Sequence, residues 1–191
     1  MDVIDLVLTE GTAKEFQIAL VDRPAIESDF LAFSKKERFK VISEDKRIIS
    51  GYAMIAELPI ERVDDKCNSF FVKFTADSIK NISEQFFKNS LTTQTNANHQ
   101  TDNFLEGVYV FESFLIDEDR GILEPKGYDK VSNGSWFVSM KVENDEVWES
   151  VKNGTFKGFS VEGVFDKKEE LTEEEEDERF FDELKKWLEL D

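Results

Sequence analysis

The chain has 191 residues, 40% of them hydrophobic and 18 of them Phe, so it is long enough for one domain with a substantial core, or for one domain plus an appendage. Its net charge of −18 argues against non-specific nucleic-acid binding, which needs Lys and Arg to neutralise phosphates, and a single Cys67 excludes an internal disulfide and a Cys-rich zinc site. No apolar run approaches the roughly 18–20 residues that span a membrane, and the acidic start MDVIDLVLTEG is unlike a secretory signal. Because the chain has a single cysteine, we expect a reducing, cytoplasm-like environment.

In chain order, the first half is predicted to form mainly strands. Apolar residues alternate or cluster in five segments: 2–9, 15–22, 38–43, 47–58 and 68–75. The sequence EGTAK forms a turn between the first two segments, and EDK connects the third and fourth as in a hairpin.

The second half combines strands with two helices. Helical spacing predicts helices over 75–91 and 144–154, and alternation predicts strands over 106–117, 135–142 and 156–165. The helices have suitable capping residues at their starts: Thr75 or Asp77 for the first and Asn144 for the second. Gly154 is expected to end the second helix.

Alternation within 106–117 also assigns side chains to faces. It places Val108, Val110 and Glu112 on one face of the strand, and Tyr109 and Phe111 on the other.

Acidic residues are concentrated at the C-terminal end. Residues 166–191 hold 13 acidic and 5 basic side chains, a net charge of −8 out of −18. Thr172 and Glu175 match a capping box, and an apolar stripe follows at helical spacing: Phe180, Phe181, Leu184, Trp187 and Leu188. We predict a β domain over 1–166 and an acidic amphipathic helical tail over 167–191, whose stripe docks on this domain, a second copy or a partner.

These elements define the expected fold class. Seven or eight strands with few helices predict a mostly β fold with peripheral helices, built as a closed or nearly closed β-barrel of about seven strands. The C-terminal amphipathic helix is added to that barrel.

A serine and a histidine form the best candidate for chemistry. Ser160 lies between Phe159 and Val161 in the last predicted strand, on the same face as Glu162. A serine hydroxyl needs a base to become a nucleophile, and His99 is the only histidine. The alternatives are an outward-facing strand hydroxyl and an ordinary loop histidine.

Other chemical assignments have less support. Cys67 is a second candidate nucleophile for His99, although a lone Cys beside an apolar strand is usually a small core residue. The acidic run 173–178 lacks the loop spacing of a calcium site and is better explained as a solvated helix face. The sequence contains no phosphate-binding glycine loop and no metal-ligand spacing, so no cofactor is expected.

Three stretches together resemble the prohead maturation proteases of tailed phages, in the branch found in prophage-like elements. They are VDRPAI (21–26), NANHQ (96–100) with the strand VYVFESFLID after it, and VWESVKNGTFKGFSVEG (147–163). The resemblance covers about residues 15–165 and implies a fold similar to the herpesvirus assemblins, a β-barrel surrounded by helices.

The resemblance implies a serine endopeptidase that digests scaffold and trims capsid proteins inside the assembling procapsid, in the host cytoplasm. By motif, Ser160 is then the nucleophile and His99 the general base, with the backbone N–H groups of Lys157 and Gly158 as oxyanion donors. Assemblins use a second histidine, which this chain lacks. Glu112, on the strand after His99, is the first choice for the orienting carboxylate, and Glu162 is the second.

The implied partners are scaffold protein and the major capsid protein, with the portal and a second copy of the chain left open. Neither direct nucleic-acid binding nor membrane binding is expected. Two other functions remain open: a non-enzymatic capsid assembly or scaffolding factor derived from a protease, and an acidic mimic of nucleic acid. The missing second histidine and the acidic tail favour the first of these two.

Overall fold

The computed structural model describes residues 3–8, 16–22, 39–63, 68–100 and 104–167. The predicted C-terminal helix, Cys67, the acidic run 173–178 and most of VDRPAI lie outside these residues.

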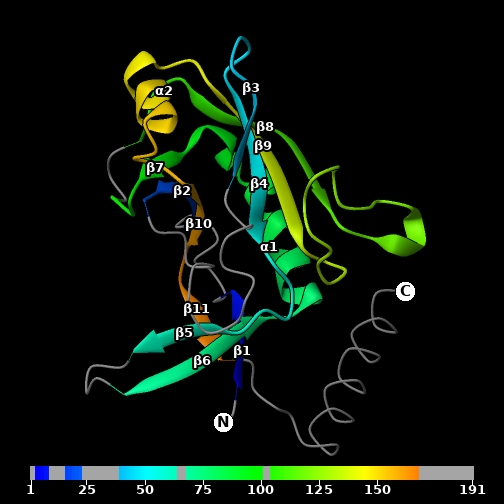
Figure 1. The fold of residues 1–191 in the computed structure, drawn as a ribbon. Helices are drawn as coiled ribbons and strands as arrows, with labels where there is room; N and C mark the ends of the chain where they lie inside the picture. Colours follow the sequence, from blue (N-terminus) through cyan, green and yellow to red (C-terminus); the bar gives the residue numbers. More distant parts are fainter. Residues whose placement is uncertain (1–2, 9–15, 23–38, 64–67, 101–103, 168–191) are drawn as a thin grey trace, which may run out of the picture.

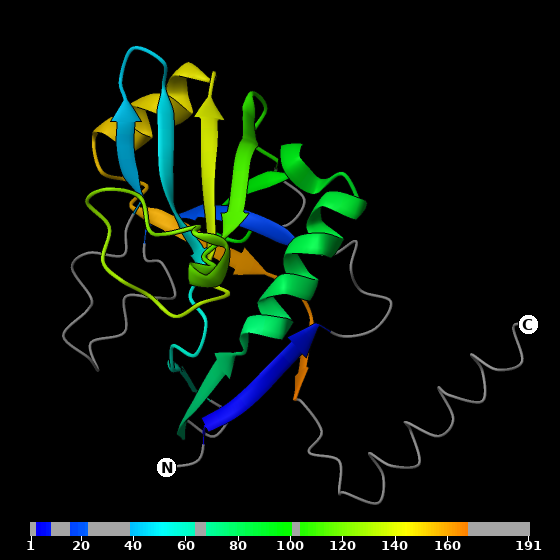
Figure 2. The ribbon, with the colours of Figure 1, turned by 90° about the vertical axis from the view of Figure 1, so that its right-hand side faces the viewer.

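The largest sheet is antiparallel and places four strands in the order β3-β4-β9-β8 (Figure 2). These strands are β3 (Lys40–Ser43), β4 (Ile48–Met54), β8 (Val108–Leu115) and β9 (Trp136–Val142). The predicted hairpin around EDK is confirmed, because β3 pairs with β4 antiparallel.

A second sheet of four strands lies at the other end of the molecule (Figure 1). Its order is β11-β1-β6-β5, and β1 runs parallel to β6. The strands are β1 (Val3–Leu8), β5 (Ile60–Val63), β6 (Ser69–Phe74) and β11 (Phe165–Lys167). Because β11 continues to Lys167, the pairing of this sheet reaches one residue past the predicted domain boundary at 166.

The third sheet is the smallest and carries the candidate site. It has the order β10-β2-β7, with β2 (Gln17–Val21) in the centre between β10 (Gly158–Glu162) and β7 (Thr95–Ala97). β10 pairs with β2 antiparallel, and β7 pairs with β2 parallel.

Two α-helices connect the sheets, and both begin where their capping residues predict. α1 (Ala76–Lys88) begins after Thr75, whose hydroxyl accepts a hydrogen bond from the Ser78 N–H. α2 (Asp145–Lys152) begins after Asn144, whose side chain accepts from the Val147 N–H. Two short 3-10 helices complete the described elements: η2 (Leu91–Thr93) and η3 (Glu118–Arg120).

One aromatic group marks the centre of the main core. Trp136 on β9 is fully buried, stacked on Phe16 at 6.3 Å between ring centroids and edge-on to Phe86 of α1 at 5.3 Å. The apolar faces of all three sheets contribute to this cluster. The small third sheet therefore packs against the core through its apolar face.

The β-rich class is confirmed, but the closed barrel is not found. The strands of the described residues form three separate sheets rather than one continuous ladder. β1 and β2, which follow each other in sequence, belong to different sheets. Local alternation identifies strands, whereas partners far apart in sequence decide which strands pair. In the described part of the chain, no helix is long and apolar enough to cross a membrane.

The face assignment along β8 is correct only for its first half. A β-bulge shifts the pairing with β9 between Val110 and Glu112, so that Phe111 is the extra residue. Val110 pairs with Met140 in the core, whereas Glu112 pairs with Ser139 on the opposite face of the sheet. The predicted placement of Glu112 beside Val110 is therefore wrong, because one inserted residue reverses the alternation after it.

Candidate active site

The small sheet has one apolar and one polar face. Ile18 and Leu20 of β2 point into the core, so the alternate residues of β2 point to the other face. There Ser160 pairs with Ala19, which in turn pairs with Asn96 across the next strand. Directly paired residues share a face. A row of serine, alanine and asparagine therefore crosses the sheet, and a second pair, Glu162 with Gln17, lies beside it.

Ser160 occupies a protected place in this row. It is 5% exposed, and its direct neighbour Ala19 is fully buried. Within the described residues, the Ser160 hydroxyl has no hydrogen-bond partner.

His99 is held by a tight turn directly after β7. Asn98 and His99 both adopt left-handed backbone conformations, with φ of 47° and 62°, and the Gln100 N–H donates to the Ala97 carbonyl at 3.0 Å. Positive φ at both central positions is the type I′ pattern, and it costs energy for a residue such as His. Asn98 also ties the turn to the end of β2, because its side-chain oxygen accepts from the Asp22 N–H at 3.0 Å.

The carboxylate beside the imidazole belongs to Glu162. The His99 Nδ1 lies 3.5 Å from the Glu162 Oε2, and the His99 side chain is 44% exposed. The same oxygen accepts a hydrogen bond from the Asn96 amide at 2.9 Å. Glu162 is thus the orienting candidate that the structure brings to His99, and it shares a strand face with Ser160.

Asn96 uses its amide group in an unusual way. Its second N–H bond points to the Gln17 side-chain oxygen, at 2.7 Å. Its own carbonyl oxygen is buried and has no hydrogen-bond partner among the described residues. An unpaired buried acceptor costs about 1–3 kcal/mol. This arrangement orients the Glu162 carboxylate, at the free-energy cost of the unpaired Asn96 oxygen.

Glu112, the first choice from the sequence, belongs to another network. Its carboxylate accepts a hydrogen bond from the Ser139 hydroxyl at 2.5 Å, and Ser139 accepts one from Ser50 at 2.8 Å. Nearby, burial raises the pKa of Tyr128 to about 12, so its hydroxyl stays protonated and donates to the Ser50 carbonyl at 2.7 Å. The structure does not bring Glu112 to His99: β7 pairs with β2, and β8 belongs to the large sheet.

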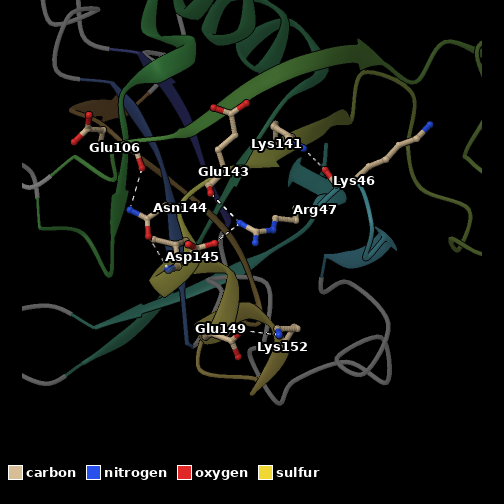
Figure 3. A network of polar contacts seen from close by, with 10 residues as sticks. Lys46, Arg47, Glu106, Lys141, Glu143, Asn144, Asp145, Glu149 and Lys152 are labelled. Carbon is tan, nitrogen blue, oxygen red and sulfur yellow. Dashed lines mark hydrogen bonds and ion pairs between the residues drawn. The ribbon is translucent and has the colours of Figure 1, made fainter.

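The helix α2 precedes β10, the strand of Ser160, and polar contacts hold the start of this helix in place. Figure 3 shows the network at the start of this helix. The Arg47 guanidinium donates to the Glu143 carbonyl at 2.9 Å and lies 2.6 Å from the Asp145 carboxylate, and the Asn144 amide donates to the Glu106 carbonyl at 3.2 Å. α2 ends at Lys152, and the left-handed Gly154 follows shortly after it as the chain turns into β10.

One expectation about a backbone group needs correction. The Lys157 N–H donates to the Val21 carbonyl at 2.8 Å, so it is not free to act as an oxyanion donor. After Glu162, the chain is closely packed: at Gly163, an added Cβ would lie 3.1 Å from both Phe16 and Phe165. The chain's own aromatic rings therefore use the space that Gly163 leaves.

Sequence reasoning missed Asn96 and Gln17. Asn96 lies three residues before His99 in NANHQ, and Gln17 is a lone polar residue in an apolar strand, so a cross-strand pairing scheme was needed to find them. Within the described ranges, no three His, Cys, Asp or Glu side chains are grouped to hold a metal ion. In general, an imidazole beside a carboxylate can transfer protons, and a serine hydroxyl can act as a nucleophile once a base activates it.

Comparisons with known proteins agree with this chemistry. Residues 38–169 match the family described as "Putative phage serine protease XkdF". The chain belongs to this family. The match confirms the resemblance to phage prohead proteases, and the matched range holds His99, Ser160 and Glu162 but not β2, the strand with which β10 pairs.

A curated XkdF relative gives the same result. The "Phage-like element PBSX protein XkdF" of Bacillus subtilis (strain 168) is 28% identical over 168 residues, which cover 83% of this chain and 55% of the relative. The chain therefore spans about half the length of this XkdF protein. No solved structure gives a significant match.

Proposed function

We propose that this chain is a serine endopeptidase that processes scaffold and capsid proteins during phage procapsid maturation. The observation that carries the proposal is the approach of the His99 Nδ1 to the Glu162 carboxylate, 3.5 Å away, on the strand face that presents Ser160. A carboxylate at Nδ1 favours the tautomer that carries its proton there, which leaves the Nε2 lone pair for a serine hydroxyl. The membership of the phage serine protease family supports the same assignment.

In the proposed mechanism, the His99 Nε2 removes the Ser160 hydroxyl proton as the Ser160 oxygen attacks the scissile carbonyl carbon. The imidazolium then gives this proton to the leaving amine, and the peptide C–N bond breaks to give an acyl-enzyme. Water next attacks the ester, with His99 taking a proton from the water and returning it to Ser160. Glu162 stabilises the imidazolium in both steps and keeps its ring in place.

The proposed setting is the interior of the assembling procapsid in the host cytoplasm, with scaffold protein and the major capsid protein as substrates. A procapsid confines enzyme and substrate in a small volume, so a modest intrinsic affinity is enough for processing. The predicted amphipathic tail would recruit the chain through its apolar stripe, and the portal or a second copy remain further partners.

Co-expression of the chain with its scaffold and capsid proteins tests the proposal directly. Intact masses are compared among the wild type, Ser160→Ala and the matched control Ser139→Ala, which removes a buried serine hydroxyl from the other network. We expect discrete truncations with the wild type and the control, and none with Ser160→Ala. Identical masses in all three samples would overturn the protease assignment.

A non-enzymatic assembly factor is the second candidate function. The protected position of Ser160, 5% exposed, is the observation that favours it. This function predicts that the scaffold and capsid proteins stay uncleaved and still assemble with the wild type, Ser160→Ala and Ser139→Ala alike. It also predicts that the protein is no longer incorporated into particles when residues 172–191 are deleted.

A further inference from the structure

The amide of Asn96 crosses the whole small sheet to reach its acceptor. Asn96 lies on the edge strand β7, and Glu162 lies on the opposite edge strand β10, with β2 between them. The Asn96 Nδ2 nevertheless lies 2.9 Å from the Glu162 Oε2. This contact passes over the central strand at the level of Ala19 and Gln17, and the methyl side chain of Ala19 leaves it unobstructed.

The hydrogen bonds of Asn96 are unevenly distributed. Both amide hydrogens are used, one on Gln17 and one on Glu162, while the fully buried carbonyl oxygen has no partner in the part of the chain that the structure describes. Such an arrangement is a poor way to stabilise a fold, since an apolar side chain of similar shape would leave no unpaired acceptor. Unpaired buried groups of this kind call for a functional explanation.

We propose that Asn96 is a positioning residue that holds the Glu162 carboxylate against the His99 Nδ1, with Gln17 fixing the orientation of the Asn96 amide. The inference rests on the proposed serine protease function and names a further member of the same site. One carboxylate oxygen faces both the Asn96 amide and the imidazole, so the amide decides where that oxygen lies. Asn96 acts only through Glu162 and His99.

The single histidine of the chain gives a readout independent of proteolysis. In protein labelled with ¹⁵N-histidine, every imidazole signal comes from His99, and the nitrogen shifts report the ratio of the Nδ1–H to the Nε2–H tautomer at a pH where the ring is neutral. The variants are Asn96→Leu, Glu162→Gln and the control Thr95→Val, which alters a buried neighbour on the other face of β7.

We expect Asn96→Leu to lower the tautomer ratio about fivefold, the effect of one hydrogen bond of ordinary strength. Glu162→Gln lowers it in the same direction, and Thr95→Val leaves it unchanged. In the cleavage assay, Asn96→Leu lowers kcat about ten- to a hundredfold with KM unchanged, as expected for a bond to a charged group that acts in the transition state.

A swap of the two groups tests whether the carboxylate must lie beside His99. The double variant Asn96→Asp with Glu162→Gln restores a carboxylate–amide hydrogen bond across the sheet, but it places the amide beside His99. We expect kcat and the tautomer ratio to stay low. Recovery of kcat in the swap would show that His99 does not need a carboxylate held at position 162 and would overturn the proposal.

The two hypotheses fail in different ways. If Ser160→Ala cleaves like the wild type, the protease function is lost, yet the tautomer ratio still tests the positioning of His99 by Asn96. If the protease is active but Asn96→Leu changes neither the ratio nor kcat, the positioning role is wrong and the protease assignment stands. Should Asn96→Leu fail to fold, Asn96→Asp, which keeps the shape of the side chain and removes its N–H donors, is measured in its place.

Discussion

Two serine–glutamate groups lie on different sheets of this protein, and they are built for different tasks. In the large sheet, Ser139 donates directly to Glu112 at 2.5 Å and receives a hydrogen bond from Ser50. In the small sheet, Glu162 instead faces the Asn96 amide and His99, and the hydroxyl of Ser160 on the same strand has no hydrogen-bond partner among the described residues.

The comparison shows that closeness of a serine to a carboxylate is no sign of catalysis. A carboxylate is a weak base for a hydroxyl, so the Ser139–Glu112 bond is a static structural contact. An imidazole differs because it has two nitrogens, one to hold a proton against the carboxylate and one to accept a proton from the serine. The shorter contact thus belongs to the less reactive group.

Removal of the imidazole should give the largest effect. We expect His99→Ala to lower the cleavage rate about 10⁶-fold, the loss found when the triad histidine is removed from a serine protease. Single-turnover cleavage of the scaffold measures it. A loss below tenfold would mean that His99 is not the base, and the two serine–glutamate groups would then be equivalent.

The two glutamates come next. Glu162→Gln should slow cleavage roughly a hundredfold, because the imidazolium loses its carboxylate while the shape of the site is kept. Glu112→Gln, the matched variant in the other network, should leave the rate within about twofold. The same assay on both variants decides which glutamate serves His99, and a reversed result would restore the choice made from sequence.

For stability, we expect the larger effect in the large sheet, at Ser139, and the smaller effect at Ser160. Ser139→Ala leaves the buried Ser50 hydroxyl without its acceptor, so we expect a loss of about 1–2 kcal/mol in the free energy of unfolding. Ser160→Ala removes a hydroxyl without a hydrogen bond in the described structure and should change stability by less than about 0.5 kcal/mol. Urea denaturation of both variants tests this, and equal losses would mean that Ser160 also has a structural partner.

The smallest effect is expected at the anchor of α2. Arg47→Ala removes an ion pair with Asp145 whose partner side chain is 84% exposed, so we expect a stability loss of only about 0.5 kcal/mol. Cleavage should be unchanged, because β10 is also fixed by its pairing with β2. A clear fall in kcat would show that the α2 anchor controls the position of Ser160.

Several features of this site could be predicted from sequence alone. The capped starts of both helices, the hairpin of β3 and β4, and the shared face of Ser160 and Glu162 all follow from local spacing. The preference for Glu112 did not survive, because it required knowledge of two things that local patterns do not contain. One is the bulge at Phe111, and the other is the parallel pairing of β7 with β2. Both depend on strand partners far apart in the chain.

The left-handed turn at His99 has a consequence for how this protein can change over evolutionary time. Glycine at that position would relieve roughly 1 kcal/mol of backbone strain and make the chain more stable, at the expense of its only imidazole. If His99 is the general base that we propose, stability and activity are opposed at this single residue. Selection for heat resistance alone would then favour glycine at this position and give a more stable protein without the proposed catalysis.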